Sequence, residues 1–460
     1  MENEVNKEEI LRDIETKYPV DQISVNGQPF WPFYRALIYS ELLKSQIIIH
    51  AYNKADIFKK IRNGLFGLGR LFRRYDYIFF SNELERKNVD DIVIDKLAEK
   101  TIELLGYDKS LYVEQVWQGH LQRKEYGKKK VLSMDLLLIL AAFFSIVFRF
   151  SKPRIAGREV LLKILSDYGL NVDINHRYSL FMAKVHAVKF LLRIHRPRMV
   201  FITDYGSYYI TYAAHALGIP VAEYQHGIIN ISYYHPARKL DARFCPDYFF
   251  VFGESDRQQL LHGLYVSAEN IFPVGSYYLQ YLYDKPVNAA ILQRMKGYAK
   301  SVCVPTNKNT QDYLLSFVRT VASRLPDVLF IFVPREKQLF GSDLPPNVMI
   351  ETELSFQEVV RHCTFHSTTY STCNLEALTL GTQNVVIDED GLSSYYLGSL
   401  LNDTTFTRFC KNADEYVETI KSFQVQERAV VHASNRNNFA PDYVRNLQSA
   451  LNKILHDHNN

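Results

Sequence analysis

Two polar side chains mark the carboxyl ends of neighbouring predicted strands in the stretch from residue 199 to residue 227. The first apolar run of this stretch ends at Asp204, and the second leads directly into Gln225, His226 and Gly227. A helical pattern separates the runs, and ligands of open parallel sheets bind outside the carboxyl ends of their strands. An imidazole titrates near neutral pH, so His226 is the residue type for moving a proton at this edge. A structural histidine fits the same position equally well.

A second group of polar side chains follows the predicted strand that ends at His366. The segment from 365 to 381 places a run of hydroxyl groups before a helix that carries Glu376. Backbone N–H groups at the start of a helix, joined by hydroxyl groups, form a site for phosphate. The alternative is that one hydroxyl group simply caps the helix. The run exceeds what a cap requires and favours phosphate binding; it consists of Ser367, Thr368, Thr369, Ser371 and Thr372.

The order of the apolar runs predicts which elements position these residues. Strands alternate with helices in both halves of the chain, and this alternation is typical of parallel sheets. In the first half, strands are expected at 75–81, 110–116, 199–203, 221–224, 247–252 and 271–274, with helices over 90–105 and 177–194. In the second half, strands are expected at 302–305, 328–333, 348–351, 363–366 and 384–387. The sequence therefore predicts an α/β protein with two doubly wound, Rossmann-like domains that face each other across a cleft.

The length of 460 residues suits two domains of roughly 200 residues each. We expect a helical N-terminal extension at 1–74, a first Rossmann-like domain at 75–280, a second at 281–435, and a C-terminal helix at 436–460. Within the extension, Trp31 is expected to pack in a core and Arg35 to be solvated.

Two segments of the first half favour contact with a membrane surface. Residues 57–74 combine apolar side chains at helical spacing with many Lys and Arg residues, a pattern that can lie on an anionic membrane. Glycines in this segment weaken a helix, so a basic loop is an equal alternative. Residues 131–148 form an apolar run of about the minimum length of a spanning helix, but Asp135 interrupts it. We expect a buried or interfacial helix there, and a peripheral protein on the inner face of the cytoplasmic membrane.

The composition narrows the class of protein. A hydrophobic content of 47% with 23% charged residues is ordinary for a globular protein. The formal net charge of +4 gives no reason to expect nucleic acid as a partner. The five cysteines show no metal-ligand spacing, which is typical of reduced thiols in a cytoplasmic protein. The acidic start of the chain carries no secretory signal pattern.

Several short motifs together resemble a known group of enzymes. The segment Ser371–Gly381, which reads STCNLEALTLG, is similar to the donor-nucleotide segment of GT-B glycosyltransferases. More narrowly, YQHG at 224–227, PDY at 246–248 and FGE at 252–254 resemble bacterial capsule and lipopolysaccharide glycosyltransferases. A more distant resemblance is to the glycerophosphotransferases of teichoic acid synthesis. The resemblance covers about 199–390 and implies the GT-B fold, with the acceptor in the first domain and the donor in the second.

By this resemblance, the second domain binds the nucleotide of a nucleotide-sugar donor. Ser371 and Thr372 would hold its phosphate, and Glu376 would contact its ribose or sugar. Many relatives carry Lys-x-His-Pro after the second strand of this domain, where this chain has Arg335. The missing histidine leaves the type of donor open. The full set of implied donor-binding residues is Ser367, Thr368, Ser371, Thr372, Glu376, Thr306, Asn307 and Arg335.

On the acceptor side, sugar transfer requires a base that takes a proton from the attacking hydroxyl group. His226 is the expected base, and Asp204 would orient it or act as base itself. Gln225, Gly227 and Glu254 would line the acceptor side. No convincing Asp-x-Asp motif marks a metal-dependent nucleotide site, so we expect no metal, and no cofactor other than the nucleotide sugar as co-substrate.

The function that the resemblance implies is transfer of a sugar from a nucleotide-sugar donor to a surface-polysaccharide or lipid-linked oligosaccharide acceptor. Three alternatives remain open. The same architecture suits a nucleotide-sugar 2-epimerase and a glycerophosphotransferase-type enzyme. It also suits a non-catalytic protein of polysaccharide assembly. The donor sugar, the acceptor and the stereochemical outcome do not follow from the sequence.

Overall fold

The chain divides into two compact units. The computed structural model describes residues 3–42, 54–89, 92–148, 153–203, 207–229, 234, 236–237, 239–261, 265–286, 288–307, 309–335 and 344–457. The first unit consists of Met1–Val251, Arg257–Pro273 and Val444–Asn460, and the second of Phe252–Asp256 and Val274–Tyr443. Asp204 lies outside the described residues.

A sheet of seven parallel strands forms the centre of the first unit, in the order β12-β11-β10-β9-β3-β6-β7. The strands are β12 (Ile271–Pro273), β11 (Tyr248–Val251), β10 (Val221–Tyr224), β9 (Met199–Ile202), β3 (Tyr77–Asn82), β6 (Ser110–Gln115) and β7 (Lys130–Ser133). Strands β9, β10 and β11 are buried at every residue. Helices cover both faces of such a sheet, which explains why these strands read as continuous apolar runs.

The second unit repeats this architecture with six parallel strands, in the order β15-β14-β13-β16-β17-β18. The strands are β15 (Val348–Ile350), β14 (Val328–Val333), β13 (Lys300–Pro305), β16 (Phe365–His366), β17 (Gln383–Ile387) and β18 (Thr407–Cys410). Its core joins β13, β14 and β17 to apolar side chains of α12 and α16.

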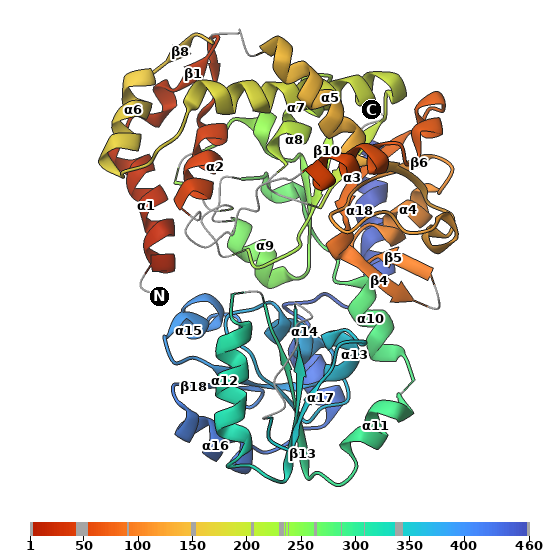
Figure 1. Cartoon of the computed structure of the whole chain (residues 1–460), viewed down its shortest axis with the longest axis vertical. Coiled ribbons are helices and arrows are strands. Elements are labelled where there is room, and N and C mark those ends of the chain that lie inside the picture. The colour runs from red at the N-terminus through yellow and green to blue at the C-terminus, as the bar shows by residue number, and fades with distance from the viewer. Residues whose placement is uncertain are drawn as a thin grey trace. The chain divides into compact units, whose positions relative to one another are not determined.

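Helices connect the strands and surround each sheet (Figure 1). In chain order up to the last strand of the first sheet they are α1 (Asn3–Lys17), α2 (Trp31–Leu42), α3 (Lys54–Gly64), α4 (Glu99–Leu105), α5 (Met134–Phe148), α6 (Arg158–Asp167), α7 (Ile174–His195), α8 (Tyr208–His215) and α9 (Glu254–Leu261). The later helices are α10 (Tyr277–Asp284), α11 (Ala289–Met295), α12 (Gln311–Ala322), α13 (Phe356–Val360), α14 (Cys373–Thr379), α15 (Leu392–Leu397), α16 (Ala413–Ser422), α17 (Arg428–Ser434) and α18 (Tyr443–Asp457). The prediction of two Rossmann-like domains with helical N-terminal additions is confirmed.

One local prediction was wrong, and a second holds with a later start. The helix expected over 90–105 is shorter, because β4 (Arg86–Val89) and β5 (Ile92–Asp95) form an antiparallel pair before α4 begins. The helix expected at 131–148 is present as α5, but it does not cover the whole apolar run. The first residues of the run belong to β7, an edge strand of the sheet, and α5 begins only at Met134.

The expectation that Arg35 is solvated was also wrong. Arg35 is 1% exposed, and its Nε donates to Oε1 of Glu15 at 2.8 Å. The same oxygen accepts a hydrogen bond from Nε1 of Trp31 at 2.9 Å, and Oε2 accepts one from the backbone of Ala237 at 2.7 Å. A charge can be buried in a core when it is paired and hydrogen-bonded in this way. Trp31 packs in the core as expected.

Helix α3 packs against α5 and ties the basic segment to the first unit. A Cβ atom on Gly64 would press on Ile139 of α5, so glycine permits the close approach of the two helices. Nearby, Nδ2 of Asn63 donates to the buried carboxylate of Asp135 at 3.1 Å. The carboxylate of Asp135, which interrupts the apolar run, therefore joins α5 to α3. None of the helices in the described part of the chain is long and apolar enough to cross a bilayer.

Candidate functional site

Four adjacent strands of the second unit bring polar residues to one edge of its sheet. The carboxyl ends of β14, β13, β16 and β17 lead into Arg335, Thr306, the hydroxyl-rich segment 367–372 and Asp388, respectively. Neighbouring parallel strands end at the same edge, which is where such sheets bind ligands. The structure thus brings the donor-side residues predicted from the sequence to this edge.

Thr306 holds the ends of β13 and β14 together. Its Oγ1 accepts a hydrogen bond from the backbone N–H of Arg335 at 3.0 Å and donates one to Oε1 of Gln311 at 3.1 Å. The side chain of Arg335 is exposed. Asn307 has a local role, because its Oδ1 accepts hydrogen bonds from the backbone of Asn309 and Thr310, both at 2.9 Å, just before α12.

The hydroxyl-rich segment divides into buried and accessible members. Ser367 is fully buried, and its Oγ lies 2.7 Å from the hydroxyl oxygen of Tyr416. Thr368 is also buried and donates to the backbone oxygen of Pro305 at 3.0 Å. Both hydroxyl groups fix the strand end from inside the protein. Their predicted contact with a phosphate stays a prediction.

Ser371 and Thr372 are half-buried at the start of α14. Oγ of Ser371 accepts a hydrogen bond from the backbone N–H of Cys373 at 3.2 Å within the turn before the helix, whereas Thr372, the N-cap residue of α14, makes no side-chain capping bond. The amide of Asn374 donates to the backbone oxygens of Thr369 and Ser371 and closes the turn before the helix. The hydroxyl groups of this turn are therefore held in place at the edge of the sheet.

Glu376 lies one turn into α14, and its Oε2 accepts a hydrogen bond from Nε2 of Gln357 at 2.8 Å. This contact orients the half-buried carboxylate. At the end of the neighbouring strand β17, Asp388 accepts two hydrogen bonds from Ser394, and Glu389 accepts one from the hydroxyl of Tyr313 at 2.6 Å. The acidic run after β17 thus fastens neighbouring helices at this edge.

Thr369 is a member of the edge whose importance the sequence did not single out. It is 7% exposed, and among the described residues its Oγ1 has no hydrogen-bond partner. Buried hydroxyl groups are nearly always paired, so this one, at a strand end, is a candidate contact for a ligand group. Its place between Thr368 and Ser371 within the hydroxyl run is the only signal the sequence carried.

His366, the residue before the hydroxyl run, is structural. It is fully buried, and its Nδ1 lies 2.9 Å from Oδ1 of Asn384 on the neighbouring strand β17. Burial lowers the pKa of His366 to about 4, so the imidazole is neutral at physiological pH. This histidine fixes the strand end.

The first unit has a corresponding edge at the ends of β10 and β11. Nε2 of Gln225 donates to the backbone oxygen of Gly227 at 2.8 Å and shapes the loop that carries the half-buried His226. Glu254 begins α9 after β11, in the short segment Phe252–Asp256 that belongs to the second unit. By contrast, Glu223 is fully buried inside β10 and accepts a hydrogen bond from the hydroxyl of Tyr265 at 2.9 Å. Its carboxylate therefore serves the core.

A small cavity of about 110 Å³ lies at the ends of the neighbouring strands β3, β6 and β9. It has room for a few water molecules or for one polar group of a ligand. The residues that line it are Phe80, Ser81, Asn82, Val113, Gln115, Trp117, Met134, Ile202, Ser207 and Ile210. The sequence did not single out Gln115, Trp117 or Ser207 as residues of this edge.

Buried charges position the walls of this cavity. The carboxylate of Glu83 accepts hydrogen bonds from the backbone N–H groups of Trp117 and Gln118, both at 2.9 Å. Next to it, Glu114 is fully buried and binds Arg86 through two hydrogen bonds of 2.7 and 2.8 Å. An ion pair therefore joins β6 to the first residue of β4, and the Glu83 hydrogen bonds join the segment after β3 to the loop after β6.

The other contacts of Glu114 extend to the loop before β7. Its Oε2 accepts a hydrogen bond from the hydroxyl of Tyr126 at 2.5 Å and lies 3.2 Å from Nδ1 of His120. Burial alone would raise the pKa of Glu114, but the hydrogen bonds from His120 and Arg86 outweigh burial and lower it. The carboxylate is therefore ionised at neutral pH.

Comparison with known proteins shows the fold and leaves the family open. No protein-family model and no curated protein matches the sequence. A co-structure of Staphylococcus aureus MnaA with UDP is similar, with a TM-score of 0.50 and 12% identity, over 84% of this chain and 97% of that chain. The chain has the GT-B fold. The UDP-GlcNAc 2-epimerase from Neisseria meningitidis bound to UDP-GlcNAc is similar too, with a TM-score of 0.49 and 13% identity, over 82% of this chain and 99% of that chain. The glycosyltransferase SnogD from Streptomyces nogalater is also similar, with a TM-score of 0.48 and 13% identity, over 82% of this chain and 100% of that chain.

The described residues contain no group of three or more His, Cys, Asp or Glu side chains that could hold a metal ion. The expectation of metal-independent chemistry stays a prediction. The roles of His226 and of the donor-side residues are likewise predictions, which the geometry of the two edges allows to be tested separately.

Proposed function

We propose that this protein is a glycosyltransferase that moves a sugar from a nucleotide-sugar donor to a surface-polysaccharide or lipid-linked acceptor. The observation that carries the proposal is the edge of the second sheet. There, the ends of β14 and β16, which lie on either side of β13, carry the cation of Arg335 and the hydroxyl groups of Thr369, Ser371 and Thr372. Helix α14, which follows β16, adds the carboxylate of Glu376. Cations and hydroxyl groups suit a diphosphate, and a carboxylate suits the hydroxyl groups of a ribose or sugar.

The shared fold supports a nucleotide as the ligand. The S. aureus structure with the same fold contains UDP. In doubly wound sheets the ligand lies outside the carboxyl ends of the strands, where the donor-side residues of this chain lie. We therefore assign the diphosphate of the donor to this edge. Arg335 would balance the charge that grows on the leaving phosphate during sugar transfer.

The acceptor would react at the edge of the first unit. His226 would accept the proton of the attacking hydroxyl group, while Gln225 holds the loop on which His226 lies through its hydrogen bond to Gly227. The small cavity between Gln115, Trp117 and Ser207 would accommodate a polar group of the acceptor. Asp204 remains a candidate to orient the imidazole.

An epimerase and a transferase differ in whether the reaction needs an acceptor. An epimerase converts a nucleotide sugar without any acceptor and leaves the bond between sugar and nucleotide intact at the end of the reaction. A transferase breaks that bond and releases the nucleotide only when an acceptor is present. The two functions therefore give different products from the same donor.

The test incubates the protein with a panel of nucleotide sugars, with and without a membrane extract as acceptor source, and separates the products by chromatography. Release of nucleotide that depends on acceptor supports the transferase. A new nucleotide sugar formed without acceptor identifies an epimerase and overturns the proposal. Transfer of phosphoglycerol from CDP-glycerol also overturns it, and binding without turnover by any donor indicates a non-catalytic assembly protein. In the transferase case, His226→Ala should lower turnover about 10²–10⁴-fold.

A further inference from the structure

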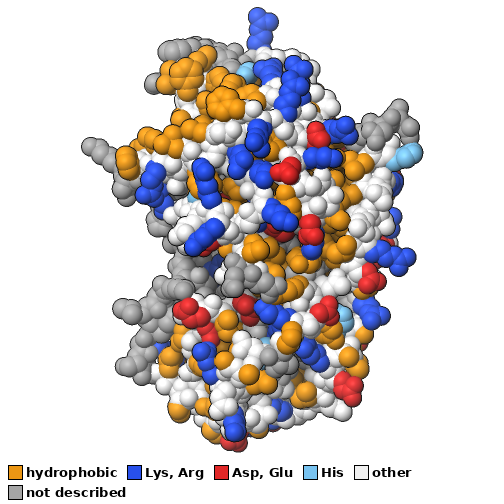
Figure 2. Space-filling model, turned by 90° about the vertical axis from the view of Figure 1, so that its right-hand side faces the viewer, with side chains coloured by type: hydrophobic (Ala, Val, Ile, Leu, Met, Phe, Trp, Pro, Cys, Tyr) orange, Lys and Arg blue, Asp and Glu red, His pale blue; other side chains and the backbone are white. Residues whose placement is uncertain are grey.

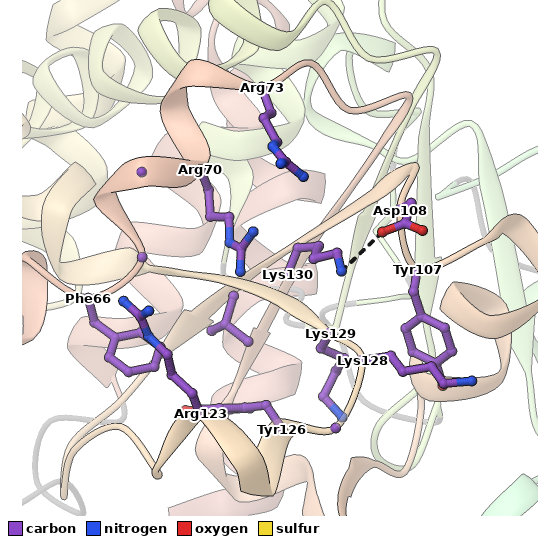
Figure 3. A pocket seen from close by; sticks show the side chains of 14 residues that line it. Phe66, Arg70, Arg73, Tyr107, Asp108, Arg123, Tyr126, Lys128, Lys129 and Lys130 are labelled. Carbon is purple, nitrogen blue, oxygen red and sulfur yellow. Dashed lines mark ion pairs between the residues drawn. The ribbon is translucent and has the colours of Figure 1, made fainter.

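A large cavity of about 820 Å³ lies on the first unit at the opposite edge of its sheet. The residues that line it come from the segments before β3 and β6 and from the loop before β7 with the first two residues of that strand, so they lie at the amino ends of these strands. The candidate catalytic edge lies at their carboxyl ends. We name this cavity the cationic basin; it is lined by Phe66, Gly67, Gly69, Arg70, Arg73, Tyr107, Asp108, Arg123, Tyr126, Gly127, Lys128, Lys129, Lys130 and Val131 (Figure 3).

The basin carries an excess of positive charge. Two of its six cations are paired: Nζ of Lys129 lies 2.6 Å from the carboxylate of Glu99, and Nζ of Lys130 lies 3.0 Å from that of Asp108. The other four make no ion pair with any described residue; they are Arg70, Arg73, Arg123 and Lys128. In the close view, the charged ends of Arg70, Arg73 and Lys130 point into the same hollow (Figure 3). Gathered cations without counter-charges bind anions.

The wall that bears Arg70 and Arg73 is firmly attached to the sheet. Gly67 has φ +80°, and a Cβ atom there would collide with the backbone oxygen of Val131 on β7. The ring of Phe66 stacks on His120 with centroids 4.4 Å apart, and the backbone oxygen of Phe66 accepts a hydrogen bond from Ser133 at 3.1 Å. The basin is therefore a preformed site.

Exposed apolar side chains adjoin the basin. Leu65 and Phe72 flank its first wall in the sequence and are 62% and 90% exposed. Helix α3 adds an exposed stripe at helical spacing, and so does α5, against which α3 packs. The stripes consist of Ile57, Phe58 and Ile61 on α3, and Ile139, Phe143, Ile146 and Val147 on α5. Figure 2 shows many Lys and Arg side chains on the face of the first unit, with hydrophobic side chains along its margin.

We propose that the cationic basin binds the phosphate groups of anionic lipid headgroups, while the apolar stripes of α3 and α5 enter the bilayer interface. A soluble phosphate compound would account for the cations but gives no role to the exposed apolar side chains. An anionic membrane surface satisfies both, because basic clusters are attracted to its phosphates and exposed apolar faces are buried in its interface. The proposal does not rest on the transferase function.

The test measures binding to vesicles of phosphatidylcholine alone and of phosphatidylcholine mixed with phosphatidylglycerol. The charge-reversed variant combines Arg73→Glu with Lys128→Glu, both exposed and on different walls of the basin. The matched control combines Lys296→Glu with Lys411→Glu, which are exposed on the second unit and change the net charge equally. A third variant, Phe58→Ser with Phe72→Ser, removes apolar contacts. Thermal melts without vesicles verify that each variant is folded.

The wild-type protein should bind the mixed vesicles in preference to the neutral ones. Each cation near an anionic surface increases binding roughly fivefold, so the charge-reversed variant should bind at least about 25-fold more weakly. The control should bind like the wild type, and the Phe58→Ser/Phe72→Ser variant should lose binding to both kinds of vesicle. Equal binding by the charge-reversed variant and its control overturns the proposal. Binding of inorganic pyrophosphate without vesicle binding also overturns it, in favour of a soluble ligand. Neither result depends on whether a nucleotide sugar is turned over.

Discussion

Removal of the buried carboxylate of Glu114 is expected to destabilise the first unit strongly. The carboxylate receives two hydrogen bonds from Arg86 and one from Tyr126, and it lies beside His120. Glu114→Ala leaves the guanidinium of Arg86, only 15% exposed, without this partner. Breaking a buried ion pair from one side lowers the free energy of unfolding by about 3–5 kcal/mol. For a unit of this size that corresponds to a fall in Tm of roughly 6–20 °C.

The assay is chemical and thermal unfolding of the wild type and three variants. Glu114→Gln keeps the shape of the side chain and should lower the free energy of unfolding by about 1.5–3 kcal/mol, less than alanine does. Glu103→Ala is the matched control, because Glu103 forms an exposed pair with Lys100 that contributes about 0–1 kcal/mol. A Glu114→Ala protein as stable as the control would refute the reasoning that this carboxylate holds β6 to Arg86 and to Tyr126.

The pH dependence of the free energy of unfolding tests the same prediction in a second way. The pKa of Glu114 is lowered in the folded protein, so its stabilising effect is present above the pKa of the unfolded chain. That effect is lost as the pH falls through the folded pKa. The stability difference between wild type and Glu114→Gln should therefore be largest near neutral pH and shrink under acidic conditions.

Further predictions concern both units. Burial, with a contribution from the charge of Glu85, raises the pKa of Asp95 to about 6. The contribution of Asp95 to stability is therefore present at low pH and is lost as the pH rises through about 6. Asp95→Asn should flatten this pH dependence in thermal melts. Gly67→Ala should lower the stability of the first unit by about 1–3 kcal/mol in chemical unfolding and weaken vesicle binding, because the new methyl group collides with β7. Wild-type vesicle binding by a folded Gly67→Ala protein would contradict this. Arg335→Ala should weaken nucleotide binding by about 1.5–3 kcal/mol in calorimetry, whereas Lys296→Ala should leave it unchanged.

The sequence predicted the elements that are decided locally. The apolar runs of β9, β10, β13 and β14 were recognised because buried parallel strands carry almost no polar residues. The alternation of strands and helices then gave the two Rossmann-like domains. The pair β4 and β5 was missed because its short strands lie within a mixed polar pattern that also suits a helix.

The missed features depend on partners that are distant in the chain. Arg35 resembles a solvated residue until Glu15 is brought beside it. The basic residues around Arg70 were recognised within 57–74, but only the packing of the loop before β3 against β7 joins them to Lys128 and its neighbours in one basin. In the donor segment, the sequence could not divide the hydroxyl groups into those bonded inside the core and those that remain at the edge. That division depends on Tyr416 and on the end of β13.

The most direct measurement of the central claim is a thermal-shift panel of nucleotides and nucleotide sugars. At a concentration about 100 times the Kd, a bound nucleotide adds about 2.7 kcal/mol, which raises Tm by roughly 5–10 °C. The shift should disappear in Ser371→Ala with Thr372→Ala. It should persist in Thr404→Ala with Thr405→Ala, whose exposed hydroxyl groups precede β18 at the opposite edge of the same sheet. If no nucleotide raises Tm, or if both double variants respond like the wild type, the donor site is not at this edge and the account fails.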